Sequence, residues 1–312
     1  MCCVARLAGP AGAGTIERFM SLSALSLVLV AALLHAFWNV VAKKAGGDSR
    51  FVLLIAMMIV VVWAPVGIWA GWDAVPRWGW AEWGLIIASG ITHLAYFNVL
   101  LRGYAASDLT VVYPVARGTG PLVASFGALL LLGESMTGLG VMGVLAITGG
   151  VFLIAGGPGL WAKAHDPAQR LRVRAGLAYG AVTGLLISGY TLIDGYSVKV
   201  WLISPVLIDY FGNFARIPFM LPAALRDWPR FKEACRAQWK HALLIAAVSP
   251  LAYVLVLYAV KLAPLSHVAP AREVSMLFAA LLGGKLLGEG ERGLRIAGAA
   301  CIALGVVGLA WG

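Results

Sequence analysis

Two related apolar stretches, one in each half of the chain, carry an arginine well inside a segment long enough to cross a bilayer. They run from 108 to 134 and from 264 to 289. In both stretches a proline and an alanine precede the arginine, and both stretches end in Leu-Leu-Gly-Glu. Arg117 and Arg272 each lie 17 residues before that glutamate. The recurrence predicts a duplicated unit, with each copy spanning a membrane.

The apolar content of the whole chain indicates a membrane protein. Hydrophobic residues make up 61% and charged residues 12%, about half of the ~25% charged residues typical of soluble proteins. Apolar runs of ~20 residues recur, which predicts several membrane-spanning helices, whereas a barrel would show alternating segments of ~10 residues. The net charge of +10 falls mostly in short loops, so we interpret it as a topology signal and predict no nucleic-acid partner.

The apolar pattern predicts an all-α polytopic membrane protein with ten transmembrane helices. A basic loop at 157–174 separates two five-helix repeats, 21–156 and 175–312. Residues 1–20 form a tail. This tail is either disordered or an artefact of a start codon placed too far upstream, in which case Met20 is the true start. Because five is odd, the second repeat must enter the membrane inverted, as in many secondary transporters. The predicted spans are 21–42, 51–71, 83–102, 109–132, 137–156, 175–196, 204–224, 241–261, 265–288 and 293–311.

The inversion brings the two arginines to similar depths. Arg117 lies about 9 residues into its span and Arg272 about 8, which correspond to ~13 Å and ~12 Å of helix. Half of a ~30 Å hydrocarbon core is ~15 Å. Both guanidinium groups should therefore approach the bilayer midplane from opposite sides, where inverted-repeat transporters bind their substrates.

Glycines and prolines inside the spans predict where helices pack and bend. Gly176, Gly180 and Gly184 recur every fourth residue, a spacing that lets helices approach closely in lipid. Pro114 and Pro270 lie just before the two arginines and should kink or unwind the helices there.

Other polar residues inside the spans are the candidates for function. A charge at the bilayer centre costs roughly 2.5–3.5 kcal/mol, so such residues usually face a partner or a water-filled cavity. A buried carboxylate can also take up a proton near neutral pH, which makes Asp194, Glu273 and Asp209 candidates for proton coupling. The candidates for substrate binding are Arg117, Arg272, Tyr113, His35, Trp38, Asn39, Tyr96, His93, Tyr190 and Arg216.

Each of these candidates also has a structural interpretation. The arginines could pair with Asp194, Asp209 or Glu273 and hold helices together. The histidines and aromatic residues could be ordinary packing residues, hydrogen-bonded within the bundle. Glu134 and Glu289, which close the two related stretches, are predicted to be structural.

The distribution of basic residues predicts the orientation. Connections that follow odd-numbered spans carry 15 Lys and Arg, and the tails and remaining connections carry 5. Because basic residues concentrate on the cytoplasmic side, this count places both termini outside.

Three motifs resemble the EamA family of the drug/metabolite transporter (DMT) superfamily. They are HAFWNVVAKK at 35–44, SDLTVVYPVARGTGPL at 107–122 and PAREVSMLFAALLGGKLLGE at 270–289. The resemblance extends from about Met20 to Trp311. It implies ten helices in two inverted repeats, a cavity lined by the first, third, fourth, sixth, eighth and ninth helices, and secondary transport, often export, of a small metabolite. Familiar members keep both termini in the cytoplasm, opposite to the charge count, and both orientations stay open.

Taken together, the sequence predicts a secondary transporter in the cell membrane, an exporter or exchanger of a small organic anion. Two forked guanidinium donors suit a carboxylate, phosphate or phosphonate. If acids neutralise both arginines, a zwitterionic or neutral substrate fits better. Protons and the lipid bilayer are the other expected partners, and the protein could be a monomer or a homodimer.

Catalytic residues, cofactors and metal sites are not predicted. The sequence lacks HExxH, GxSxG and a glycine-rich phosphate loop, which are the usual signatures of hydrolases and nucleotide-binding enzymes. Its four cysteines have no metal-ligand spacing and form no disulfide framework. An intramembrane enzyme or a non-transporting membrane sensor is a remote alternative.

Overall fold

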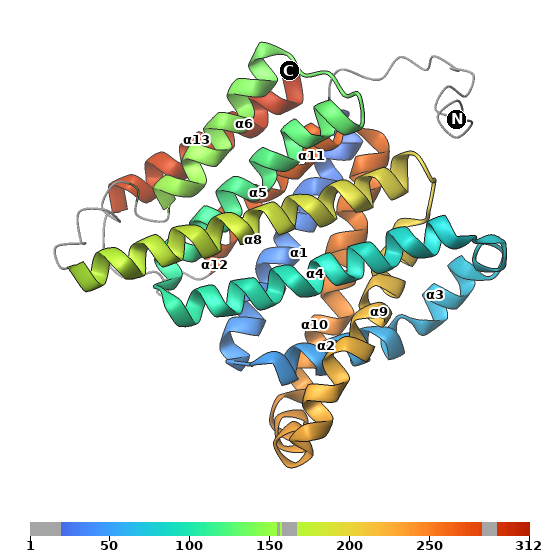
Figure 1. The fold of residues 1–312 in the computed structure, drawn as a ribbon. Helices are drawn as coiled ribbons and strands as arrows, with labels where there is room; N and C mark the ends of the chain where they lie inside the picture. The colour runs from blue at the N-terminus through green and yellow to red at the C-terminus, as the bar shows by residue number, and fades with distance from the viewer. Residues whose placement is uncertain (1–19, 155–156, 158–166, 283–291) are drawn as a thin grey trace, which may run out of the picture.

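A computed structural model shows an all-helical bundle and describes residues 20–154, 157, 167–282 and 292–312 (Figure 1). Helices account for nearly all of this described part, which contains no β-strand. The elements are α1 (Leu22–Ala45), α2 (Ser49–Val62), α3 (Ala64–Gly71), η1 (Val75–Arg77), α4 (Trp80–Ala106), α5 (Leu109–Leu131), α6 (Gly138–Ile154), α8 (Pro167–Lys199), α9 (Pro205–Arg226), α10 (Trp228–Leu262), α11 (Leu265–Ala271), η2 (Arg272–Val274), α12 (Ser275–Leu282) and α13 (Arg292–Trp311).

Five of the described helices, α1, α4, α8, α10 and α13, are long and apolar enough to cross a bilayer. The pair α2 and α3, bent by 56° next to Pro65, adds a sixth candidate span. Helices α5 and α9 lie at two further predicted spans, but each contains two prolines in its interior and at least one charged residue, which lowers its hydropathy. The chain is therefore a multi-pass membrane protein, and the count of ten spans stays a prediction.

Two helices begin well before the predicted spans do. Helix α8 starts at Pro167 and α10 at Trp228, whereas hydropathy placed their spans from 175 and 241. The added turns are rich in lysine and arginine, which are good helix formers. A hydropathy pattern detects only the lipid-embedded part of such a helix, so the second half of the predicted loop 157–174 is helical instead.

The principal contacts between helices of different repeats are symmetric: each has an equivalent in which the two repeats are interchanged. The first helix of each repeat packs against the third helix of the other, as α1 with α10 and α8 with α4. Likewise α8 packs against α5, and α1 packs against α12. The last helices of the repeats, α6 and α13, pair with each other and run side by side in Figure 1. This exchange is what an inverted repeat with pseudo-twofold symmetry requires.

Glycines bring the closest helix pairs into backbone contact. A Cβ placed on Gly150 of α6 would lie 2.6 Å from the carbonyl oxygen of Gly298 of α13, and one on Gly143 would lie 2.7 Å from that of Gly305. On α8, a Cβ on Gly180 would lie 2.9 Å from the carbonyl oxygen of Val112. The close approach predicted for the α8 glycines is therefore present, and it is directed at α5.

Glu134 joins three elements at one end of the bundle. Its Oε1 accepts hydrogen bonds from Lys199 Nζ at the end of α8 and from the Leu265 amide, both at 2.7 Å. Its Oε2 accepts from the Ser266 amide at 2.8 Å. Burial alone would raise the pKa of Glu134, but the Lys199 charge and these hydrogen bonds outweigh burial and lower it. The predicted structural role of Glu134 agrees with these contacts, whereas Glu289 lies outside the described residues.

We expect Glu134→Gln to destabilise the protein by about 3–5 kcal/mol, because it leaves Lys199 without its buried counter-charge. The measurement is the thermal unfolding midpoint in detergent at pH 7. Glu82→Gln, at an exposed helix start, is the matched control and should change stability by at most about 1 kcal/mol. Equal midpoints for Glu134→Gln and the wild type would show that the three contacts contribute little.

Candidate functional site

A cavity of about 290 Å³ lies between the two repeats. Its walls come from α1, α2, α4, α5, α8, α9 and α10, with Arg272 added from the short turn η2. All ten residues that the sequence predicted to bind substrate line this one cavity. The family resemblance implied most of these helices, and the structure adds α2 and α9, the second helix of each repeat.

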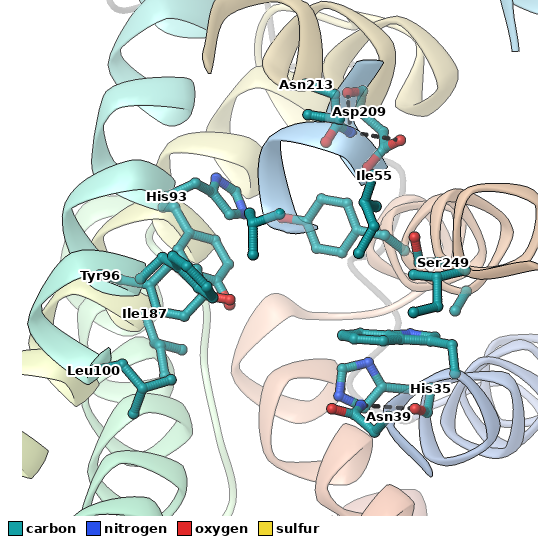
Figure 2. Close-up of a pocket in the computed structure, with 18 of the residues that line it drawn as sticks. His35, Asn39, Ile55, His93, Tyr96, Leu100, Ile187, Asp209, Asn213 and Ser249 are labelled. Carbon is teal, nitrogen blue, oxygen red and sulfur yellow. Dashed lines mark hydrogen bonds between the residues drawn. The ribbon is translucent and has the colours of Figure 1, made fainter. Parts of the chain in front are cut away.

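An aromatic wall forms one side of the cavity. The rings of His93 and Tyr190 are stacked with centroids 3.7 Å apart. Tyr96 lies 5.4 Å from Tyr190, and Tyr253 meets His93 edge-on at 5.9 Å. Figure 2 shows His93 and Tyr96 on one side of the cavity. This wall can hold an apolar or aromatic group by stacking.

The opposite side of the cavity is polar and comes from α1. His35 and Trp38 meet edge-on with ring centroids 4.9 Å apart, and the Asn39 side-chain amide donates to the His35 carbonyl at 2.7 Å. Figure 2 shows His35 and Asn39 across the cavity from the aromatic wall. The buried indole N–H of Trp38 has no hydrogen-bond partner among the described residues, so it is available to a ligand acceptor.

Arg117 is held by residues of the other repeat. Its Nε lies 2.9 Å from Glu273 Oε2, an ion pair in which the carboxylate side chain is 1% exposed. Its Nη2 donates to Ser275 Oγ at 3.0 Å. Arg117 also lies over the Tyr113 ring, 5.9 Å from the centroid. The structural ion pair considered from the sequence is therefore present for Arg117.

Arg272 differs from Arg117 in forming no ion-pair contact among the described residues, although Glu273 also interacts with it electrostatically. Within the described part of the chain, no carboxylate lies within 4.0 Å of its guanidinium group, and its buried Nε has no hydrogen-bond partner. The residue is 6% exposed and lines the cavity. The helix break that was predicted at Pro270 occurs here, because α11 ends at Ala271 and a 3₁₀ turn begins at Arg272.

The three carboxylates predicted for proton coupling have different surroundings. Asp209 lines the cavity, and Asn213 Nδ2 donates to its Oδ2 at 3.2 Å. Glu273 is the ion-pair partner of Arg117 and lies behind the cavity wall. Asp194 is fully buried outside the lining, where Tyr253 Oη donates to its Oδ2. Of the three, only Asp209 can touch a molecule in the cavity directly.

Sequence reasoning missed Tyr253 and Ser275. Tyr253 belongs to the aromatic wall and contacts Asp194, and Ser275 fixes Arg117. The signal for Tyr253 was a repeated spacing, because Ser89 and His93 in the third span are four residues apart, as are Ser249 and Tyr253 in the eighth. A hydroxyl such as that of Ser275 gives no comparable signal in an apolar span.

The described residues contain no cluster of three or more His, Cys, Asp and Glu side chains that could hold a metal ion. Besides the Asp209 carboxylate, the polar groups that line the cavity are guanidinium, imidazole, indole, phenol, amide and hydroxyl groups. They can donate hydrogen bonds to a small organic molecule and stack on it.

Comparison with known proteins identifies the fold's family. The sequence matches the EamA-like transporter family over residues 22–156 and again over 174–311. The chain belongs to the EamA-like transporter family. This match confirms the resemblance that the three motifs indicated. Because two segments match, the EamA unit occurs twice in this multi-pass membrane protein.

The comparison with solved structures concerns the fold alone. One crystal structure of a protein superposes on this EamA-like chain with a TM-score of 0.70, covering 93% of this chain and 97% of that chain at 17% sequence identity. At this level of identity the likeness establishes a shared architecture and carries nothing about substrate. No curated protein matches the sequence.

Proposed function

We propose that this EamA-like protein is a secondary transporter, in the plasma or inner membrane, that exports or exchanges a small organic anion. The substrate class would be a carboxylate, phosphate or phosphonate that carries an apolar group. The observation that supports this proposal is Arg272, a buried guanidinium group that lines the cavity and has no carboxylate within 4.0 Å among the residues that the structure describes. A buried charge that makes no direct ion pair is costly, and a bound anion would supply such a contact beyond the electrostatic interaction with Glu273.

The rest of the cavity suits the other parts of such a substrate. Arg216 also lines the cavity, and its buried Nε has no hydrogen-bond partner in the described part of the chain. The stacked rings of His93 and Tyr190 offer a flat surface to an apolar group. The Trp38 N–H offers one more donor. Anion recognition at one end and stacking at the other would fix the orientation of the substrate.

The Arg117–Glu273 ion pair supports a second candidate, transport of a zwitterionic or neutral molecule. With Arg117 neutralised, the cavity also contains Asp209, whose carboxylate could balance Arg272 or Arg216 when a substrate carries both charges. The two candidates differ in whether a substrate needs a negative charge, which makes a neutral isostere of an anionic probe the decisive comparison.

We expect benzoate and phenylphosphonate to stabilise the purified protein against thermal unfolding, and benzamide to have no such effect. A ligand at 100 times its dissociation constant adds about 2.7 kcal/mol to the free energy of unfolding. Equal stabilisation by benzoate and benzamide would favour the second candidate. Sealed vesicles loaded with phenylphosphonate should also take up labelled phenylphosphonate by exchange, and protein-free vesicles should not. Absence of both effects would contradict the proposed anion transport.

A further inference from the structure

Asp194 is a buried carboxyl group whose neighbouring donors are neutral hydroxyl groups, those of Tyr253 and Ser89. It is 0% exposed and lies just behind the aromatic wall of the cavity. Its Oδ2 accepts a hydrogen bond from Tyr253 Oη, and its Oδ1 is buried without a partner in the described part of the structure. No Lys, Arg or His nitrogen lies within 4.0 Å there, in contrast to Glu134 and Glu273, which both have ion-pair partners.

Tyr253 connects this carboxyl group with the cavity. Its ring lines the cavity and meets the edge of His93, while its hydroxyl turns to Asp194. Of the described side chains that line the cavity, Tyr253 is the one that also forms a hydrogen bond with Asp194. A molecule in the cavity can therefore compete with Asp194 for the Tyr253 hydroxyl.

Other titratable or charged groups approach Asp194 and Tyr253 from the surrounding helices. From α4 comes Ser89, whose hydroxyl group interacts with Asp194 as a hydrogen-bond donor. His93, on the same helix, contacts the Ser89 hydroxyl at 3.3 Å. From α9 come Asp209 and Arg216, which interact with Asp194 electrostatically. Tyr190 on α8 and Arg272 on η2 interact with Tyr253 in the same way. The cations act at a distance, so none replaces the hydroxyl contact.

The hydrogen-bond chemistry of the pair depends on a proton. An ionised carboxylate only accepts, so Tyr253 must donate to it. A protonated Asp194 can donate its own O–H to the Tyr253 oxygen, and the phenolic O–H is then free to turn toward the cavity. Uptake of one proton from water by Asp194 thus converts Tyr253 from a donor to Asp194 into a donor to a cavity anion.

We propose that Tyr253 couples the binding of an anion in the cavity to protonation of Asp194, so that each bound anion is accompanied by one proton. The proposal rests on the anion-transport function proposed above and assigns Tyr253 as the positioning residue that links the two sites. Because coupling between two binding equilibria is reciprocal, the anion affinity must rise as the pH falls, and anion binding must take up a proton.

The test measures benzoate binding to the purified protein by calorimetry between about pH 6 and 8, where benzoate stays ionised. We expect the affinity to fall about tenfold per pH unit, about 100-fold across this range, because an affinity linked to the uptake of one proton changes tenfold for each unit of pH. A total change of this size is within the range of one charge-assisted hydrogen bond. Comparison of two buffers with different ionisation enthalpies gives the number of protons taken up, which should approach one. Tyr253→Phe should bind benzoate with a pH-independent affinity and no proton uptake.

Two further variants make the result specific. Asp194→Asn mimics the neutral carboxyl group and should show at pH 8 the affinity that the wild type shows at pH 6. Tyr258→Phe, on the same helix and 38% exposed, is the matched control and should keep the wild-type pH dependence. A wild-type affinity that does not change with pH, or a pH dependence that Tyr253→Phe retains, would overturn the coupling while leaving anion binding intact. Failure of the wild type to bind any anion at either pH would instead overturn the anion-transport proposal on which the coupling rests.

Discussion

Arg272→Gln is expected to lose anion binding and to keep the folded state. The guanidinium group would be the main charged contact of the substrate, and truncation of one partner of a buried charge pair costs about 2–5 kcal/mol. Benzoate affinity should therefore fall by about 100-fold or more. The unfolding temperature without ligand should stay the same or rise, because the variant removes a buried charge that has no carboxylate within 4.0 Å in the described structure.

The control for this experiment is Arg77→Gln, which makes the same change at an exposed position on η1. It should leave both benzoate affinity and unfolding temperature unchanged. If Arg272→Gln bound benzoate as well as the wild type does, Arg272 would not be the anion site. A large drop in its unfolding temperature would show instead that Arg272 has a structural role in the bundle.

Glu273→Gln is expected to give the opposite result, a loss of stability of about 3–5 kcal/mol. The substitution leaves Arg117 buried without its counter-charge, and breaking a buried ion pair from one side is strongly destabilising. Arg117→Gln should be similarly unstable because it strands Glu273. The measurement is thermal unfolding of each variant in detergent, without ligand.

The double variant Arg117→Gln/Glu273→Gln tests whether the two residues stabilise the protein as an ion pair or contribute independently to its stability. Replacement of both charges by neutral groups of similar shape is often nearly neutral for stability, so the double variant should recover most of the lost stability. If its loss instead equalled the sum of the two single losses, the residues would act independently, and the 2.9 Å contact would carry no coupling energy.

Much of the fold and of the candidate site can be predicted from the sequence because the bilayer is an apolar solvent. Apolar runs of membrane length predict helices because lipid satisfies no backbone hydrogen bonds. The same environment explains why His35, His93, Asn39 and the arginines converge on one cavity, because polar side chains in spanning helices must face away from lipid. Hydropathy therefore predicted the lining residues without any knowledge of how the helices pack.

The pairing of charges could not be predicted in the same way. Glu273 follows Arg272 directly, yet it contacts Arg117 from the other repeat. Successive residues of a helix point in directions about 100° apart, so neighbours in the sequence seldom pair. The 3₁₀ turn at Arg272–Val274 changes these directions further. Only the packing of the two repeats determines which carboxylate meets which guanidinium group.

The exchange of contacts between the repeats has a consequence for the energy of the transport cycle. If each repeat adopted the conformation of the other, equivalent helices would again pack against each other. The open end of the substrate pathway would then become the closed end, and the closed end the open one. The free-energy difference between the two arrangements would then come only from positions where the repeats differ. Arg117 and Arg272 correspond, but the residue after Arg117 is Gly118 and the residue after Arg272 is Glu273. The Arg117–Glu273 ion pair consequently has no symmetry-related counterpart. If the exchange of conformations separates these two residues, the ion pair would favour the arrangement that contains it.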